Sequence, residues 1–85
     1  MNKEDRIAFI TTHGYKNVTK FSEAVHEDVS NVHKILGGQQ LPRIEKLFTY
    51  AAALDVDITK LLSLFYPEDM KRYKEARRQR KEGSK

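Results

Sequence analysis

Residues 26–38 read HEDVSNVHKILGG, and they contain both a start and an end signal for a very short helix. Asp28 is a residue type that favours the N-cap position, and Gly37-Gly38 is typical of the residues that follow a helix. The apolar residues on one helical face are Val32, Ile35 and Leu36. Because a helix of two or three turns is unstable alone, this stretch predicts a helix that packs on a larger domain and leaves its polar face free.

A second short helix is expected immediately before this stretch. Asn17 is a candidate N-cap, and it opens the segment VTKFSEAVH, which has apolar residues at helical spacing. Very few residues, around His26, separate the two helices. Two short helices with so tight a connection match the helix-turn-helix, in which the second helix leaves one face for DNA.

The rest of the chain predicts further helices and no convincing strand, so the expected fold class is all-α. Asn2 caps the first helix, which ends at Gly14. Pro42 opens the most strongly amphipathic helix, because a proline lacks the N–H that a first helical turn leaves unpaired. Asp57 caps a fifth helix, and Pro67 opens a sixth. The core face expected for the helix after Pro42 consists of Ile44, Leu47, Phe48, Ala51 and Leu54.

The charge distribution divides the chain near residue 66. For 85 residues one small domain is expected. Residues 1–66 hold eight Lys/Arg and eight Asp/Glu, whereas residues 67–85 carry the whole excess of +4. We therefore expect a folded domain over 1–66 and a basic C-terminal helix or tail over 67–85. Three interpretations of this tail stay open: a solvated end, a phosphate-binding arm, or a dimer contact through Met70 and Tyr73.

Several other classes of function find no support in the sequence. Cysteine is absent, and His13, His26 and His33 lack the spacing of zinc ligands, so no metal site is expected. No spacing joins a nucleophile to a base, and no glycine-rich phosphate loop is present, so we expect neither an enzyme nor a cofactor. There is no membrane-spanning apolar run and no signal-peptide pattern, which favours a cytoplasmic protein without membrane contact.

The candidate DNA-binding residues lie on and around the short helix. Base contacts are expected from its N-terminal half, because a recognition helix reaches base edges through three or four side chains there. Phosphate contacts are expected at the N-terminus of the preceding helix and in the loop after the recognition helix. Solvated surface explains several basic and glutamine positions equally well. The candidates are Asn17, Lys20, Val29, Ser30, Asn31, His33, Lys34, Gln39, Gln40 and Arg43.

One spacing pattern extends over most of the first 65 residues. It has a cap, a large apolar residue and a small residue in the second helix, a β-branched residue in the third, and then a glycine and a proline. These residues are Asn17, Phe21, Ser22, Val32, Gly38 and Pro42. Together with the ending LDVDITKLL, the pattern resembles that of the lambda-repressor/Cro-type (XRE-like) helix-turn-helix domains of phage and plasmid regulators. His26 stands where this family usually has glycine, and histidine enters the left-handed region more readily than most residues.

The resemblance implies a compact five-helix domain, here followed by the basic helix. It also implies a sequence-specific transcriptional regulator, most often a repressor, that binds double-stranded DNA as a homodimer on an inverted repeat through residues 28–36. An alternative of another class is a helix-turn-helix scaffold that binds a protein partner, as an antitoxin, anti-repressor or inhibitor does. The neutral charge of residues 1–66 keeps this alternative open, since DNA-binding domains usually have a basic surface.

Overall fold

The computed structural model describes residues 2–83, with side chains described to residue 80. These residues contain six helices and no strand. The all-α class predicted from the sequence is therefore confirmed. The helices are α1 (Lys3–Thr12), α2 (Val18–Ala24), α3 (Val29–Leu36), α4 (Ile44–Leu54), α5 (Ile58–Phe65) and α6 (Pro67–Gly83). Residues 84 and 85, the end of the expected basic tail, lie outside the described residues.

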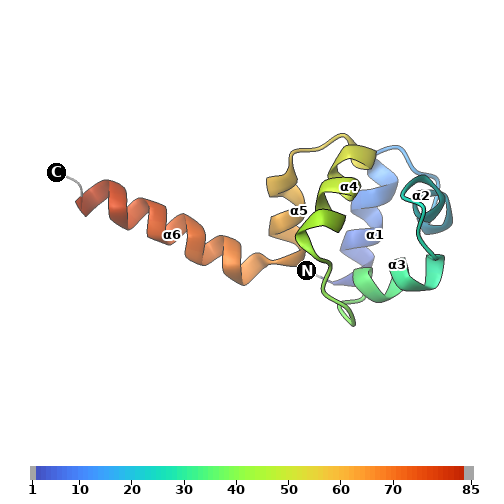
Figure 1. The fold of residues 1–85 in the computed structure, drawn as a ribbon, viewed down its shortest axis with the longest axis horizontal. Helices are drawn as coiled ribbons and strands as arrows, with labels where there is room; N and C mark the ends of the chain where they lie inside the picture. The colour runs from blue at the N-terminus through green and yellow to red at the C-terminus, as the bar shows by residue number, and fades with distance from the viewer. Residues whose placement is uncertain (1, 84–85) are drawn as a thin grey trace.

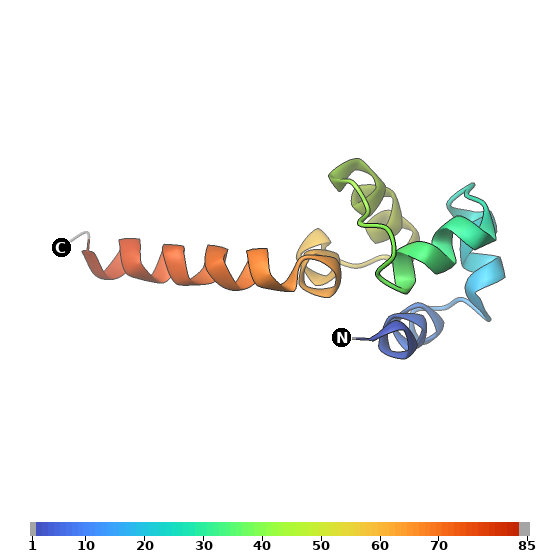
Figure 2. The same cartoon turned by 90° about the horizontal axis from the view of Figure 1, so that it is seen from below.

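The first five helices pack together, and α6 projects from them as a single rod (Figure 1). The longest extent of the molecule is 50 Å, against 24 and 21 Å in the other directions. Seen from below, α2 and α3 lie at the end of the molecule away from α6 (Figure 2). The chain therefore has a globular part over α1–α5 and an extended C-terminal helix.

Three of the predicted N-caps form as expected. The side chains of Asn2 and Asn17 each accept a hydrogen bond of 2.9 Å from the backbone N–H three residues further on. Asp57 accepts hydrogen bonds from the backbone N–H and the hydroxyl of Thr59, at 2.9 and 2.8 Å. These two hydrogen bonds favour the ionised carboxylate and lower the pKa of Asp57 from its ordinary value of 3.8. Each cap pairs a backbone donor that a helix start otherwise leaves to water.

The start of α4 differs from the prediction. Pro42 was expected to open this helix, but the first helical residue is Ile44 and the N-cap is Arg43, with extended backbone at φ −71° and ψ 160°. Pro42 is fully buried, and its carbonyl accepts a hydrogen bond from the Tyr66 hydroxyl. The proline therefore packs in the core as part of the preceding segment, and this tertiary contact outweighs its local preference for a first helical turn.

The core face of α4 also differs from the prediction in two residues. Leu47, Ala51 and Leu54 are buried as expected, whereas Ile44 and Phe48 are 46% and 58% exposed. The buried residues of α4 are Leu47, Tyr50, Ala51 and Leu54. Since each residue turns a helix by about 100°, Ile44 and Phe48 lie about 60° and 100° to one side of Leu47. The apolar stripe of α4 is thus wider than the core, and its outer edge faces solvent.

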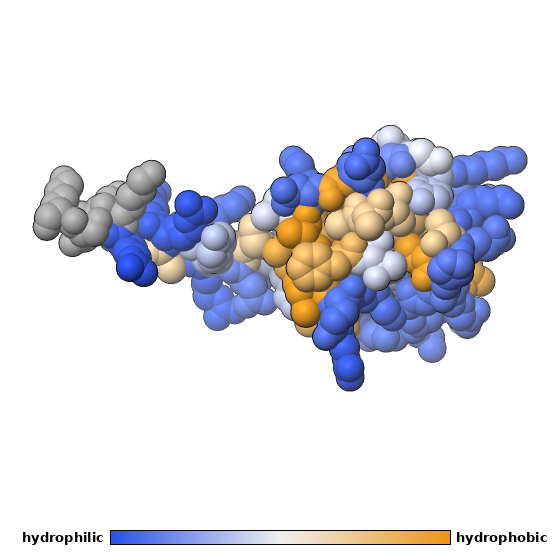
Figure 3. Space-filling model, turned by 45° about the horizontal axis from the view of Figure 1, so that its top comes forward, coloured by the Kyte–Doolittle hydropathy of each residue, from blue (hydrophilic) through white to orange (hydrophobic). Residues whose placement is uncertain are grey.

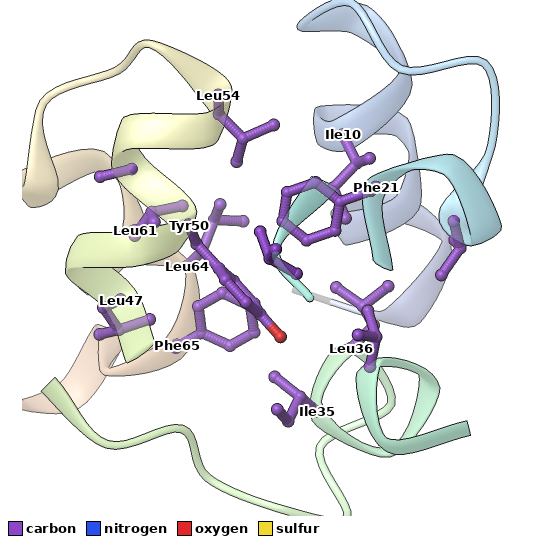
Figure 4. Close-up of a cluster of buried hydrophobic side chains, with 14 residues drawn as sticks. Ile10, Phe21, Ile35, Leu36, Leu47, Tyr50, Leu54, Leu61, Leu64 and Phe65 are labelled. Carbon is purple, nitrogen blue, oxygen red and sulfur yellow. The ribbon is translucent and has the colours of Figure 1, made fainter. Parts of the chain in front are cut away.

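Aromatic side chains form the centre of the core. Side chains from α1–α3 face those from α4 and α5 across it (Figure 4). Phe21 packs edge-to-face with Tyr50, with ring centroids 4.9 Å apart, and with Tyr15, at 5.3 Å. Edge-to-face contact is a favoured geometry for aromatic rings. The two halves of the domain therefore meet at the Phe21–Tyr50 pair.

A guanidinium group lies at the junction of three helices. Arg6 of α1 donates hydrogen bonds of 3.0 Å to the carbonyl of Leu36, at the end of α3, and to the carbonyl of Leu64, near the end of α5. Its Cζ atom also lies 4.8 Å from the centre of the Phe65 ring. The last carbonyls of a helix lack partners within the helix and carry partial negative charge, so a cation stabilises them. Arg6 thereby joins the C-terminal ends of α3 and α5 to α1.

We expect the substitution Arg6→Ala to lower the free energy of unfolding by about 2–3 kcal/mol, because buried carbonyls at two helix ends lose a charged donor. Urea unfolding followed by circular dichroism measures this change. Arg6→Lys should recover only part of the loss, since an ammonium group cannot reproduce the planar fork that reaches both helix ends.

The matched control is Arg78→Ala, because Arg78 is an exposed arginine on α6. An exposed side chain of this kind contributes within about 0.5 kcal/mol to stability. Equal stabilities for Arg6→Ala and Arg78→Ala would contradict the role given to Arg6.

Candidate nucleic-acid interface

The connection between α2 and α3 is a four-residue turn with one residue in the left-handed region. His26 has φ 56°, the left-handed conformation that the resemblance implied for this position. The backbone N–H of His26 donates to the carbonyl of Glu23, and the N–H of Glu27 donates to that of Ser22 at 3.0 Å. These bonds close the end of α2 and turn the chain directly into α3. The two helices pack against each other as a pair.

The α3 helix has a buried face and an exposed face. Val32, Ile35 and Leu36 are at most 1% exposed and belong to the core. Ser30 and Lys34 are exposed on the opposite side. A short helix of this kind is held by its apolar face, so its exposed side chains need no internal partners to keep the helix in place.

Three other candidate residues on α3 are less exposed to solvent than the sequence indicated. Val29, Asn31 and His33 are only partly exposed, and Val29 packs against the core cluster. Val29 was expected to point outward with Ser30, but it contributes in part to packing. The exposed surface of α3 is therefore concentrated at Ser30 and Lys34, with the edge of His33 beside them.

The start of α3 has no side-chain cap, unlike the starts of α1, α2 and α5. Asp28 occupies the N-cap position, but its side chain caps no backbone N–H. Its carboxylate instead accepts a 2.6 Å hydrogen bond from the hydroxyl of Ser30. The predicted side-chain cap is therefore wrong, although the N-cap position is right. The first backbone N–H groups of α3 are left available to solvent or to an anion.

A carboxylate in the turn joins α3 to α4. The side chain of Glu27 is 13% exposed and accepts hydrogen bonds from Lys46 at 2.6 Å, from the Tyr50 hydroxyl at 2.8 Å and from the Asn31 amide. Lys46 and Tyr50 belong to α4, and Asn31 belongs to α3. Asn31, a candidate for DNA contact, is thus used to fix α3 against the domain. The Glu27 carboxylate therefore links α3 to α4.

The ionisation of this network follows from its contacts. Burial opposes the charged form of Glu27, but hydrogen bonds from Lys46, Tyr50 and Asn31 outweigh that effect, so the pKa of Glu27 is lowered from its ordinary value of 4.5. Burial, together with the adjacent carboxylate, raises the pKa of Tyr50 well above its usual range. At neutral pH the network is therefore an ionised carboxylate paired with a lysine and a neutral tyrosine.

The candidates outside α3 lie on the surface around it. Asn17 is committed to its capping bond, and Lys20 forms an ion pair of 3.6 Å with Glu23. The side chains of that pair are 60% and 62% exposed, so the ion pair contributes little to stability. The backbone N–H groups of Gln39 and Gln40 donate to the Lys34 carbonyl, which leaves their exposed side chains unrestrained by that contact.

A cleft of about 430 Å³ lies between the turn and the start of α4. It brings together His26, Gln40, Arg43 and Lys46, which come from three separate parts of the chain. Glu27 and Glu45 also line it, so its charge is mixed. Arg43 is exposed at the N-terminus of α4, where a phosphate-binding side chain is expected from the sequence.

Sequence reasoning missed two basic side chains near α3. Lys46 reaches Glu27 from α4, and Lys3 of α1 passes beside Gly37 at the end of α3. Both are distant from α3 along the chain, so no local pattern indicates them. The charge of Lys46 is balanced by Glu27, whereas Lys3 places an exposed positive charge near the C-terminal end of α3.

Within residues 2–83, no group of three His, Asp or Glu residues has the arrangement of a metal site, and no helix has both the length and the apolar character to cross a membrane. No protein-family model, curated protein or solved structure matches the chain.

We expect Glu27→Gln to lower the free energy of unfolding by about 1–2 kcal/mol at pH 7, because Lys46 then loses its charged partner and Asn31 loses a charged acceptor. The folded pKa of Glu27 is below 4.5, so the unfolded chain takes up the proton first as the pH falls. The stability due to Glu27 is complete above pH 4.5 and is lost as the pH falls through the folded pKa. The difference in the free energy of unfolding between the wild type and Glu27→Gln should therefore become smaller at acidic pH.

Urea unfolding at pH 7 and at about pH 3 measures this difference. The control is Glu23→Gln, which removes an exposed carboxylate of α2 and should change stability by less than about 0.5 kcal/mol at either pH. A difference that stays constant between the two pH values would refute the charged network at Glu27.

Proposed function

We propose that the chain is a sequence-specific DNA-binding regulator of the lambda-repressor/Cro type, with α2 and α3 as its helix-turn-helix and α3 as the recognition helix. In this proposal α1–α5 form the five-helix domain. The protein binds an inverted-repeat operator as a homodimer, in the cytoplasm, and represses transcription by occluding the promoter. No catalytic step and no cofactor is required for this function.

One observation carries the proposal. Two short helices are joined by a four-residue turn, and the second is buried on one side by Val32, Ile35 and Leu36 while Ser30 and Lys34 are exposed on the other. A major groove admits a single α-helix, and the residues that read bases lie near its N-terminal end. The length and the two faces of α3 agree with this requirement.

The electrostatics of the surface also support DNA binding, although residues 1–66 are neutral. Glu27 directs its charge inward to Lys46 and Tyr50, and Asp28 is bonded to the Ser30 hydroxyl. Positive groups at Lys3, Lys34 and Arg43 are exposed around α3. In this proposal the charge of Glu27 is balanced by Lys46, so Glu27 repels phosphates less than the sequence alone indicates, whereas Asp28 keeps its exposed charge beside Ser30.

Selection of bound fragments from random double-stranded DNA tests the proposal directly. We expect an enriched site with two-fold symmetry and half-sites about one helical turn apart, because two recognition helices must enter successive major grooves. The salt concentration must be fixed, since affinity for DNA depends steeply on it. If no sequence is enriched, the proposal is contradicted.

We expect Lys34→Ala to weaken binding to the selected site by about tenfold or more, and Ser30→Glu to abolish it, because a carboxylate at that position repels phosphates. Gel-shift titration measures binding, and circular dichroism verifies the fold. The control is Lys60→Ala, since Lys60 is an exposed lysine on α5. Unchanged specific affinity in both α3 variants would show that α3 is not the recognition helix.

A second candidate function is supported by a specific observation. Leu41, Ile44 and Phe48 are large apolar residues, each between 46% and 61% exposed, and they lie close together in sequence. An exposed apolar surface on a neutral domain is compatible with a helix-turn-helix scaffold that binds a protein, as an antitoxin or anti-repressor does. In the selection experiment this function predicts no DNA enrichment by a folded protein.

A further inference from the structure

An apolar groove lies where α4, α5 and α6 meet. Its volume is about 370 Å³, and its lining residues are Ile44, Leu62, Tyr66, Asp69, Met70 and Tyr73. Apolar side chains gather on the face of the globular part beside the base of α6 (Figure 3). Ile44 and Tyr73, which line the groove, are 46% and 53% exposed. A monomer with such a surface leaves apolar area in water that a partner is able to cover.

The α6 helix has little support from the rest of the molecule. It packs on α5 at its start, but residues 71–80 are all exposed. A helix without tertiary packing is marginally stable in water at this length. A second helix lying along its first turns would bury Met70 and Tyr73 and stabilise the rod.

The charges on this side of α6 are arranged in a self-complementary way. Asp69, Tyr73 and Arg77 follow one another at intervals of four residues, so they lie along one stripe of the helix. Arg77 lies over the Tyr73 ring, with Cζ 5.7 Å from the ring centre. Asp69 and Arg77 are each about 6 Å from Tyr73 along the helix axis, in opposite directions. A copy of α6 running antiparallel, with Tyr73 at the centre, therefore places opposite charges next to each other at both ends.

We propose that two copies of the chain associate through α6 in an antiparallel, two-fold arrangement centred on Tyr73. Asp69, which accepts a 2.9 Å hydrogen bond from the exposed Arg72 of its own helix, pairs in addition with Arg77 of the second copy. The two Tyr73 rings meet at the axis. A two-fold interface uses the same surface on both copies, which the symmetric spacing about Tyr73 satisfies. This inference deepens the homodimer of the proposed function by naming its interface.

The same arrangement accounts for the groove. When α6 of the second copy runs antiparallel, its C-terminal half lies beside the start of α6 and hence along Ile44, Leu62 and Tyr66. Arginine side chains cover apolar surface with their aliphatic stems while the charged ends stay in water. The basic half of α6 is thus suited to a groove with an apolar floor and an acidic residue, Asp69, at its edge.

Charge exchange within the whole chain tests the inference, with sedimentation equilibrium in the absence of DNA as the readout. Asp69→Arg and Arg77→Asp should each raise the dimer dissociation constant about tenfold, because each replaces two attractions with two repulsions. The double variant should return close to the wild-type value. Within one chain the two residues are about 12 Å apart along the axis, so only contact between copies gives this recovery.

The control is Arg78→Asp, which introduces the same charge change one residue further on and about 100° around the helix. It should leave dimerisation unchanged, and Asp69→Arg combined with Arg78→Asp should show no recovery. Circular dichroism detects any loss of α6 itself. A wild type that stays monomeric, or a double variant weaker than both single variants, would overturn the inference.

The dimer interface and the proposed function can fail independently in these experiments. A dimer that shows the charge recovery but selects no DNA removes the regulator and leaves this interface in place. A dimer that selects a symmetric operator but shows no charge recovery removes this interface and leaves the regulator.

Discussion

The packing of Arg6 against the ends of α3 and α5 is the constraint on which the arrangement of the domain depends. An eight-residue helix such as α3 has no stability of its own, and its last carbonyls need donors. Arg6 supplies a donor to Leu36 and to Leu64 at once, and it does so from the first helix of the chain. Its Nε atom is buried without a hydrogen-bond partner among the described residues, so its position is set by the two carbonyls and by the Phe65 ring.

The second link, through Glu27, acts on the other end of α3. Arg6 holds the C-terminal end, whereas Glu27 joins the first turns to α4 through Asn31, Lys46 and Tyr50. Together with the buried Val32 and Ile35, these contacts leave α3 little freedom to rotate or slide. For a helix that is proposed to read base edges, such rigidity matters because the contacts require a fixed geometry.

What was predictable from the sequence was local. Asn2, Asn17 and Asp57 cap their helices because capping depends on a few neighbouring residues, whereas the left-handed conformation of His26 was implied by the resemblance. Asp55 was missed: it ends α4 with φ 55°, a conformation that Asp adopts more readily than most residues, and no glycine indicated it. The all-α class followed from the same local patterns.

The errors arise where distant parts of the chain meet. Pro42 packs in the core rather than opening α4, and Phe48 lies outside the core although it fits the apolar spacing. Periodicity shows which side chains share a stripe of a helix, but not how much of that stripe the other helices cover. The Glu27–Lys46 pair joins residues 19 positions apart, so no window of local sequence contains it. Of the candidate site, Ser30 and Lys34 were placed correctly on the exposed face, whereas Val29 and Asn31 are partly used by the fold itself.

The separation of the two faces of α3 bears on how such a protein diversifies. Val32, Ile35 and Leu36 hold the helix, while Ser30 and Lys34 make no contact with the core. Exchanging the exposed pair therefore alters the chemistry offered to a target at almost no cost in folding. Under the proposed function, a duplicated copy of this chain would acquire a new operator through substitutions at the exposed positions of α3 while every packing residue stays the same, and the two copies would then coexist without competing for one site.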